Sequence, residues 1–329
     1  MTDAAGLEVN SLTVTASDYL AVRPILDRVS LEIAPGECLG LVGESGSGKS
    51  MTARSILGVP PDGLTVTGRV RHRGLDLDMA DRGAMRQWRA AQVGVVFQEP
   101  HRIMDPTRTV GDYLGEVLTL VRDVPRREVQ RRSIQGLHQV GIDDPAGSLK
   151  RYPHELSGGQ LQRAVIAAAL LVEPSLLIAD EPTTALDTTT QALVTVLLNR
   201  ARHERNLSML YITHNLELAM AICDRIAVMY AGQILEVSRA GAIRREARHP
   251  YTEALLRCRP NIGQRREALP VIEGQPPGLQ TPLPGCPFAP RCPRTDSTCQ
   301  AKRPVLVSTG QGAAACFHPL LGKPSPVTA

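Results

Sequence analysis

The sequence has few aromatic side chains, no long apolar run and little excess charge. Only 3% of its 329 residues are aromatic, and Trp88 is the single tryptophan, so a core must rest on aliphatic side chains. The longest apolar run, residues 164–172, is much shorter than the roughly 18 residues that a membrane-spanning helix needs. A net charge of +4 is small for this length, which argues against nucleic acid as the partner.

A signal peptide is not expected either. The first residues are acidic and mixed in character, whereas a signal peptide starts basic and becomes apolar. The sequence also contains no internal repeat and no heptad run. We therefore expect a cytosolic protein whose contact with any membrane is made through partners.

Four short apolar runs predict buried strands of a parallel sheet. They are residues 37–42, 93–97, 176–179 and 209–213. Polar or glycine-rich segments follow each run at once, and the carboxyl ends of parallel strands are where such a sheet binds its ligands. The sequence therefore predicts an α/β fold with its chemistry at one edge of the sheet.

Two other regions differ in composition. Residues 99–155 are polar, arginine-rich and helical in pattern, and we place an inserted helical subdomain at about 99–173. Further along, residues 276–293 contain seven prolines and are not expected to form regular helix or strand. We expect a main domain at residues 1–247 and a small irregular accessory region at residues 248–329.

Residues 43–50 match the phosphate-loop pattern G-x-x-x-x-G-K-S/T directly after the first predicted strand. The glycines allow backbone N–H groups to surround phosphates, and a helix starting at Gly48 points its positive end at the same oxygens. Lys49 is expected to bind the β- and γ-phosphates and Ser50 to ligate Mg²⁺. A glycine-rich turn without a ligand is the alternative. The expected nucleotide-binding residues of this segment are Gly43, Glu44, Ser45, Gly46, Ser47, Gly48, Lys49, Ser50 and Met51.

Asp180 and Glu181 end the third predicted strand. A carboxylate at a strand end can hold Mg²⁺, and the next one can polarise an attacking water as a general base. The alternative is that the pair only caps a helix. With a phosphate loop upstream, we interpret Asp180 as a magnesium ligand and Glu181 as the base.

Leu156-Ser-Gly-Gly-Gln160 precedes Asp180, with a strongly helical stretch at residues 161–171 between them. Ser157 can cap that helix, and Gly158 and Gly159 leave the backbone open to a phosphate. With this motif between the two parts of a phosphate site, the chain resembles the ATPases of ABC transporters over residues 7–240. The resemblance implies a P-loop NTPase with a RecA-like core, and it makes residues 1–247 the nucleotide-binding domain.

The same resemblance assigns roles to further residues. It implies that Ser157 and Gly159 contact the γ-phosphate of ATP bound by a second subunit, with Gly158 and Gln160 in the same loop. It makes Gln98 a sensor of Mg²⁺ and water, Ala185-Leu186-Asp187 a loop that communicates across the dimer, and His214 a contact of the γ-phosphate. The expected catalytic residues are Lys49, Gln98, Glu181 and His214. The expected magnesium ligands are Ser50, Gln98 and Asp180.

Two of these positions have ordinary alternatives. Taken alone, His214 is a polar residue at a strand end, and its place downstream of Glu181 is what favours the catalytic role. Tyr19 is the nearest candidate for stacking on adenine, the alternative being a packing or surface tyrosine.

Four of the seven cysteines lie in the last 44 residues, with the spacing C-x5-C-x6-C-x16-C. They are Cys286, Cys292, Cys299 and Cys316. With His249-Pro-Tyr-Thr252 before it, this tail resembles the C-terminal extension of oligopeptide and dipeptide importer ATPases, which implies a 4Fe–4S cluster on the four cysteines. Arg291 and Arg294 are expected to offset its charge. A Cys₄ zinc site, unmetallated cysteines and His318 as a substitute ligand stay open.

The resemblance implies an importer subunit that couples ATP binding and hydrolysis to uptake of dipeptides and oligopeptides. The implied partners are a second ATPase subunit, as a heterodimer, two transmembrane permease subunits and an extracytoplasmic binding protein. The implied location is the cytoplasmic face of the cell membrane. Uptake of nickel, glutathione or opines, a soluble ABC ATPase acting on ribosomes or DNA, and an iron–sulfur redox enzyme are the alternatives.

Overall fold

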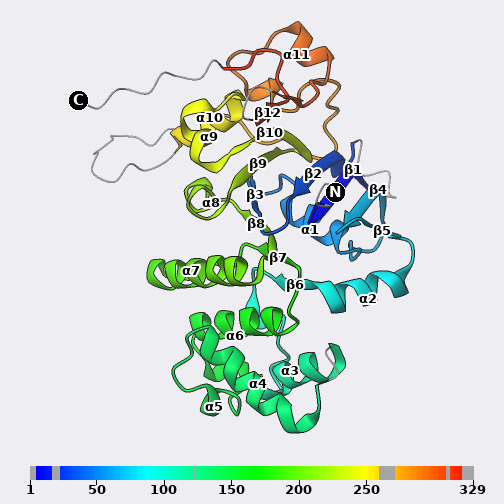
Figure 1. Cartoon of the computed structure of the whole chain (residues 1–329). Coiled ribbons are helices and arrows are strands. Elements are labelled where there is room, and N and C mark those ends of the chain that lie inside the picture. The colour runs from blue at the N-terminus through cyan, green and yellow to red at the C-terminus, as the bar shows by residue number, and fades with distance from the viewer. Residues whose placement is uncertain are drawn as a thin grey trace, which may run out of the picture. The chain divides into compact units, whose positions relative to one another are not determined.

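The computed structural model (Figure 1) describes residues 5–16, 23–121, 124–184, 186–258, 271–308 and 312–320. Tyr19 and Ala185 lie outside these residues. The chain divides into two compact units, each assembled from separate segments. The first unit contains residues 32–38 and 71–212 with a short N-terminal piece, and the second contains residues 8–31, 39–70 and the chain from 213 onward.

The first unit is built on parallel strands in the order β6-β7-β8, which are β6 (Val93–Val96), β7 (Leu176–Asp180) and β8 (Ser208–Thr213), the last residue of β8 belonging to the second unit. Leu176 pairs with Val93 on one side and with Ser208 on the other. Every residue of β7 and β8 is buried, as expected for parallel strands covered on both faces. The apolar runs that predicted these strands therefore lie in the core of this unit.

The rest of the first unit is mainly helical. The short strand β5 (Leu75–Leu77) and α2 (Arg82–Gln92) precede β6, and α7 (Thr188–Arg205) follows β7. The described chain between β6 and β7 is helical, and comprises η1 (Pro100–Arg102), α3 (Val110–Glu116), the π-helical turn η2 (Val117–Val121), α4 (Arg126–Gln139), α5 (Pro145–Ser148), η3 (Pro153–Glu155) and α6 (Gly158–Leu171). Helices therefore occupy the segment predicted at about 99–173, and their status as a separate subdomain stays a prediction.

The second unit holds two groups of strands, apart from their residues 7, 32–33, 38 and 71–72, which belong to the first unit. β1 (Leu7–Ala16), β2 (Leu26–Ile33) and β4 (Leu64–His72) lie in the order β2-β1-β4. β3 (Cys38–Val42) is parallel to β9 (Arg225–Tyr230), which is antiparallel to β10 (Gln233–Arg239). The helices of this unit are α1 (Lys49–Ile56), α8 (Leu216–Ile222), α9 (Ala240–Glu246), α10 (Pro250–Arg257) and α11 (Ser297–Ala301).

The C-terminal segment joins this second unit through a strand. β12 (Gly312–Ala314) pairs antiparallel with β10, Ala314 opposite Glu236, and β11 (Val307–Ser308) pairs with β12. Between residues 271 and 308 the remaining elements are short, η4 (Ala289–Arg291) and α11. An accessory region with its own boundary at 247/248 stays a prediction, because the described part of this segment extends a sheet of the second unit.

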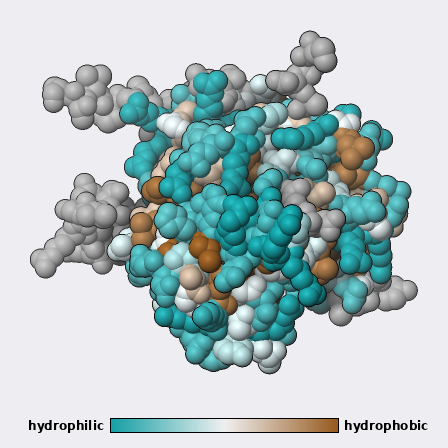
Figure 2. Space-filling view, turned by 60° about the horizontal axis from the view of Figure 1, so that its bottom comes forward, coloured by the Kyte–Doolittle hydropathy of each residue, from teal (hydrophilic) through white to brown (hydrophobic). Residues whose placement is uncertain are grey.

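The strands predicted at residues 37–42, 93–97, 176–179 and 209–213 are confirmed as β3, β6, β7 and β8. In the part of the chain that the structure describes, no helix is both long and apolar enough to cross a bilayer. The face drawn in Figure 2 is mainly hydrophilic, with apolar side chains in small separate patches.

Candidate active site and cysteine cavity

The phosphate loop connects β3 to α1 in the second unit. Gly46 and Gly48 have φ angles of +77° and +107°, which favour glycine. A Cβ on Gly43 would lie 2.1 Å from the carbonyl oxygen of Met229. The sequence pattern thus places glycine where the chain turns or passes close to another strand.

Lys49 is buried at the start of α1, with 6% of its surface exposed. Its ammonium donates hydrogen bonds to the carbonyl oxygens of Gly43 and Glu44, at 2.8 and 2.9 Å. The loop therefore curls around its own lysine. Ser50 and Met51 follow in the first turn of α1 and are half-buried.

Glu181 and Gln98 come together in the first unit. Asp180 is the buried last residue of β7, and Glu181 follows it with a φ of +49° and an N–H that donates to Ile212. The Glu181 carboxylate accepts a hydrogen bond from the Gln98 amide at 3.1 Å and from the Thr184 hydroxyl at 2.8 Å. The left-handed backbone at a non-glycine residue is costly and is typical of functional sites.

Residues 156–160, called the signature segment below, form a capping box at the start of α6. The Ser157 hydroxyl accepts from the N–H of Gln160 at 3.3 Å, and the Gln160 side chain accepts from the N–H of Ser157 at 3.1 Å. A Cβ on Gly158 would meet no atom within 4 Å, so the backbone here is open. The predicted cap by Ser157 is confirmed.

Asp187 caps the next helix, α7. Its carboxylate accepts from the hydroxyl of Thr190 at 2.6 Å and from its N–H at 3.0 Å, and these hydrogen bonds lower the pKa of Asp187. The side chain of Thr190 also lies 2.8 Å from where a Cβ of Gly159 would stand. Thr190, which the motifs did not single out, therefore joins the signature segment to the Asp187 loop.

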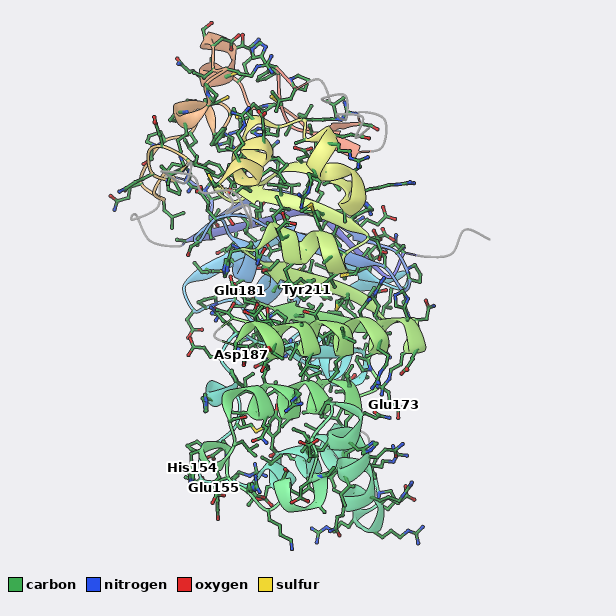
Figure 3. The ribbon with its side chains drawn as sticks, turned by 90° about the vertical axis from the view of Figure 1, so that its left-hand side faces the viewer. His154, Glu155, Glu173, Glu181, Asp187 and Tyr211 are labelled. Atoms are coloured by element: carbon green, nitrogen blue, oxygen red, sulfur yellow. The ribbon has the colours of Figure 1, made fainter. Side chains whose placement is uncertain are left out.

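His214 follows β8 and is exposed just before α8, in the same unit as the phosphate loop. Gln98, Asp180, Glu181 and the signature segment belong to the other unit. That all of them act on one nucleotide stays a prediction, and Tyr19 cannot be placed because it lies outside the described residues. Figure 3 shows Glu181 and Asp187 on the same side of the first unit, with Glu173 well away from both.

The four clustered cysteines line one small cavity in the second unit, together with two histidines. The N–H of Cys286 donates to the carbonyl of Cys299 at 2.8 Å. Burial raises the pKa of all four thiols, that of Cys286 to about 11, and the other three thiols add to the rise at Cys286. A cation that stabilises thiolates would displace these protons, so metal binding here would strengthen as the pH rises.

His249 supplies a test of whether this cavity suits a sulfur-bound group. Its Nδ1 accepts the N–H of Tyr251 at 3.0 Å, and burial lowers the pKa of the ring to about 3, so the ring is neutral and carries its proton on Nε2. Within the described residues, this buried Nε2 has no hydrogen-bond partner. A cavity with four thiols and one unsatisfied N–H donor fits a thiolate-bound group, whose sulfur atoms accept such bonds.

Glu236 of β10 holds the start of α10, where the His249-Pro-Tyr-Thr252 segment lies. Its buried carboxylate accepts from the N–H groups of Arg248 and His249 at 2.9 and 2.8 Å, while burial raises its pKa. His318 also lines the cysteine cavity, and its Nε2 is 2.9 Å from the carboxylate of Asp296. The ligand atoms of Asp296, Cys299 and His318 lie within 4.8 Å of one another, which keeps a mixed metal site open.

Arg291 does not have the position predicted for it. Arg294 lines the cysteine cavity, whereas the guanidinium of Arg291 is bonded to the carboxylate of Glu44 in the phosphate loop. Arg291 and Arg294, although close in sequence, therefore face different groups, and Arg291 lies at the end of the 3₁₀ turn η4 with its side chain bonded to Glu44.

A glycine-rich loop between a parallel strand and a helix is typical of a P-loop nucleoside triphosphatase. An acidic pair at the end of another parallel strand is typical of the same class. Two family models match the chain: "ABC transporter" over residues 26–184 and "Oligopeptide/dipeptide transporter, C-terminal region" over residues 235–299. The chain belongs to the ABC transporter family, which confirms the resemblance and the P-loop fold.

Individual proteins agree with this assignment. The chain is 40% identical to the dipeptide transport ATP-binding protein of Escherichia coli (strain K12), over 97% of this chain and 99% of that protein. It is 41% identical to the protein of the same description from Bacillus subtilis (strain 168), over 91% and 90%. A dimeric bacterial ABC transporter cassette has a similar structure, with a TM-score of 0.64, 26% identity and coverage of 71% of this chain and 98% of that one.

Proposed function

We propose that this chain is the ATP-hydrolysing subunit of an importer of dipeptides and oligopeptides. The observation that carries the substrate class is the similarity to dipeptide transport ATP-binding proteins along nearly the whole chain, including the C-terminal region at residues 235–299. The observations that carry the reaction lie one in each unit: the phosphate loop around Lys49 in the second, and the Gln98–Glu181 contact in the first.

Binding and hydrolysis use different residues. The N–H groups of the phosphate loop and Lys49 would bind the phosphates of ATP. Ser50 and Asp180, with Gln98, would hold Mg²⁺, which would supply positive charge to offset that of the phosphates. Glu181 polarises the attacking water, with its carboxylate oriented by Gln98 and Thr184. His214 contacts the γ-phosphate, while Ser157, Gly158, Gly159 and Gln160 act on nucleotide bound by the partner.

The chain works as part of a membrane complex. Its partners are a second, related ATPase subunit, two transmembrane permease subunits and an extracytoplasmic binding protein that delivers the peptide. It lies at the cytoplasmic face of the cell membrane without crossing it. The Gln98 loop and the helices between β6 and β7 pass the closing and reopening of the ATPase pair to the permeases.

Reconstitution of the complete transporter in vesicles tests this proposal. Labelled dipeptides or oligopeptides should accumulate only with ATP and with the loaded binding protein. ATP-dependent uptake of nickel, glutathione or opines without peptide uptake would overturn the assigned substrate class, while the role as an ATPase subunit would stand. Stable purification with ribosomes or DNA, and without permeases, would overturn the transporter itself.

The four cysteines of the cavity would hold a 4Fe–4S cluster, which would fix the proline-rich C-terminal segment. Two observations support this group: all four thiols line one cavity, and His249, which lines it too, has a buried Nε2 without a hydrogen-bond partner among the described residues. Both describe a fit for sulfur-bound metal, with zinc as the competing occupant.

Metal analysis of anaerobically purified protein should find about four irons and four sulfides per chain, with the visible absorption of a cluster. Cys299→Ser should lower both contents, whereas Cys258→Ser, a cysteine that does not line the cavity, should leave them unchanged. Zinc alone would make the site a Cys₄ zinc site, and no metal in either protein would refute a resident group.

A further inference from the structure

Glu44 in the phosphate loop is held by the C-terminal part of the second unit. Its N–H donates to the hydroxyl of Tyr251 at 2.9 Å. Its carboxylate accepts two hydrogen bonds from the guanidinium of Arg291, at 2.8 and 3.2 Å. Its carbonyl accepts from Lys49 at 2.9 Å. Each polar group of this loop residue therefore has a fixed partner, and two of the partners come from beyond residue 250.

Arg291 is suited to hold the loop rigidly. Its side chain is only 5% exposed, and its other donors bond the hydroxyl of Tyr230 and the carbonyls of Ile272 and Glu273. A guanidinium that pairs with a carboxylate through two parallel bonds fixes both distance and orientation. A lysine at this position would keep the charge and lose that geometry.

Three aromatic side chains pack together beside the contacts between Glu44, Tyr251 and Arg291, which we call the junction. The rings of Tyr230, Tyr251 and Phe288 contact one another with centroids 4.7 to 5.4 Å apart. The Arg291 guanidinium lies 5.8 Å from the Tyr230 ring centre and 6.0 Å from that of Phe288. These packed rings keep Tyr251 and Arg291 in their positions against the loop.

One short segment connects this junction to the cysteine cavity. Residues 286–292 begin and end with cysteines that line the cavity, and between them they carry Phe288 and Arg291. His249 lines the cavity as well, contacts the Phe288 ring at 5.9 Å between centroids, and accepts the N–H of Tyr251. A change in the cavity that moves Cys286 or Cys292 must therefore move the groups that hold Glu44.

We propose that Arg291 and Tyr251 are positioning residues for the phosphate loop, and that through them the affinity for nucleotide depends on the state of the cysteine cavity. The proposal rests on the proposed function, since it takes the nucleotide to be ATP. Coupling between two sites is reciprocal, so bound nucleotide should in turn stabilise the state of the cavity that favours its binding. A purely structural ion pair would stabilise the fold without linking the two sites.

The rate at which the cavity cysteines are alkylated, with and without nucleotide, measures this coupling. The full chain, as purified without oxygen, is treated with N-ethylmaleimide together with a chelator that does not bind Mg²⁺, so that the cysteines react as any bound metal leaves. Modification of the four cavity cysteines is followed by mass spectrometry. Mg²⁺ with a non-hydrolysable ATP analogue should slow their modification by about fivefold or more. The Kd of the same analogue is measured in parallel.

Two variants remove different contacts between Glu44 and the C-terminal part of the second unit. Tyr251→Phe removes one hydroxyl, and Arg291→Lys keeps the positive charge. Both variants should therefore fold, and circular dichroism checks that they do. Each should abolish the slowing and raise the Kd of the analogue by about fivefold or more. Arg303→Lys is the matched control, because Arg303 is also a C-terminal arginine, paired with Asp27 and not with the loop.

The outcomes separate the two proposals. If the wild-type chain binds the analogue and its cysteines react at an unchanged rate, the coupling is refuted while the ATPase function stands. The same holds if both variants keep the slowing. If the wild-type chain does not bind the analogue at all, the proposed ATPase function fails, and the coupling fails with it.

Discussion

Replacing Glu181 by glutamine should lower ATP turnover by about 100-fold or more and leave nucleotide binding intact. The glutamine amide has the size of the carboxylate but cannot accept a proton from water. In the structure this carboxylate accepts hydrogen bonds from Gln98 and Thr184, which orient it at the end of β7. Because binding depends on the phosphate loop, the variant should hold ATP in the closed ATPase pair.

Phosphate release by the assembled transporter measures the turnover, and retention of labelled ATP measures the binding. Glu173→Gln is the matched control, an exposed carboxylate just beyond α6 that lies well away from Glu181 (Figure 3). It should hydrolyse ATP at the wild-type rate. Turnover near the wild-type rate in Glu181→Gln would mean that another group polarises the water.

The features that the sequence predicts are those built from residues close together along the chain. A loop of eight residues directly after a buried strand, and two acids at the end of another, need no knowledge of distant contacts. The capping box of Ser157 and Gln160 is equally local, since the partners are three positions apart. Strand β7 and helix α6 follow from the same short-range patterns.

The junction on Glu44 could not be found in this way. Tyr251 and Arg291 lie 207 and 247 positions from it, and no local pattern pairs residues over such distances. The sequence placed Arg291 beside the cysteines because it precedes Cys292, whereas the backbone turn directs its side chain to the phosphate loop. The cysteine spacing predicted the gathering of the thiols but gave no sign of the unsatisfied Nε2 of His249.

Strand β1 was missed for a different reason. Its buried residues alternate at Leu7 and Val9 and again at Leu12 and Val14, with the phase shifted by one residue between the pairs. Ser11, with a φ of +53°, marks the irregularity. A shift of this kind breaks the period of two by which strands are recognised in a sequence.

Replacing Lys49 by methionine should weaken ATP binding by about 10- to 100-fold, since hydrogen bonds to a charged group each contribute roughly 1.5–3 kcal/mol. Methionine keeps the length of the side chain but has no charge and no donor. In the structure the ammonium donates hydrogen bonds to the carbonyls of Gly43 and Glu44 inside the loop, and it would also attract the phosphates of ATP. The loss therefore affects both the shape of the loop and its attraction for the ligand.

Arg54→Met is the matched control, because Arg54 is a cation on the same helix, α1, with its side chain exposed. The Kd of a non-hydrolysable ATP analogue is measured for both variants, with circular dichroism as a check of folding. Arg54→Met should bind as the wild-type chain does. Wild-type affinity in Lys49→Met would mean that the phosphates are bound elsewhere, and the assignment of residues 43–50 as the phosphate site would have to be withdrawn.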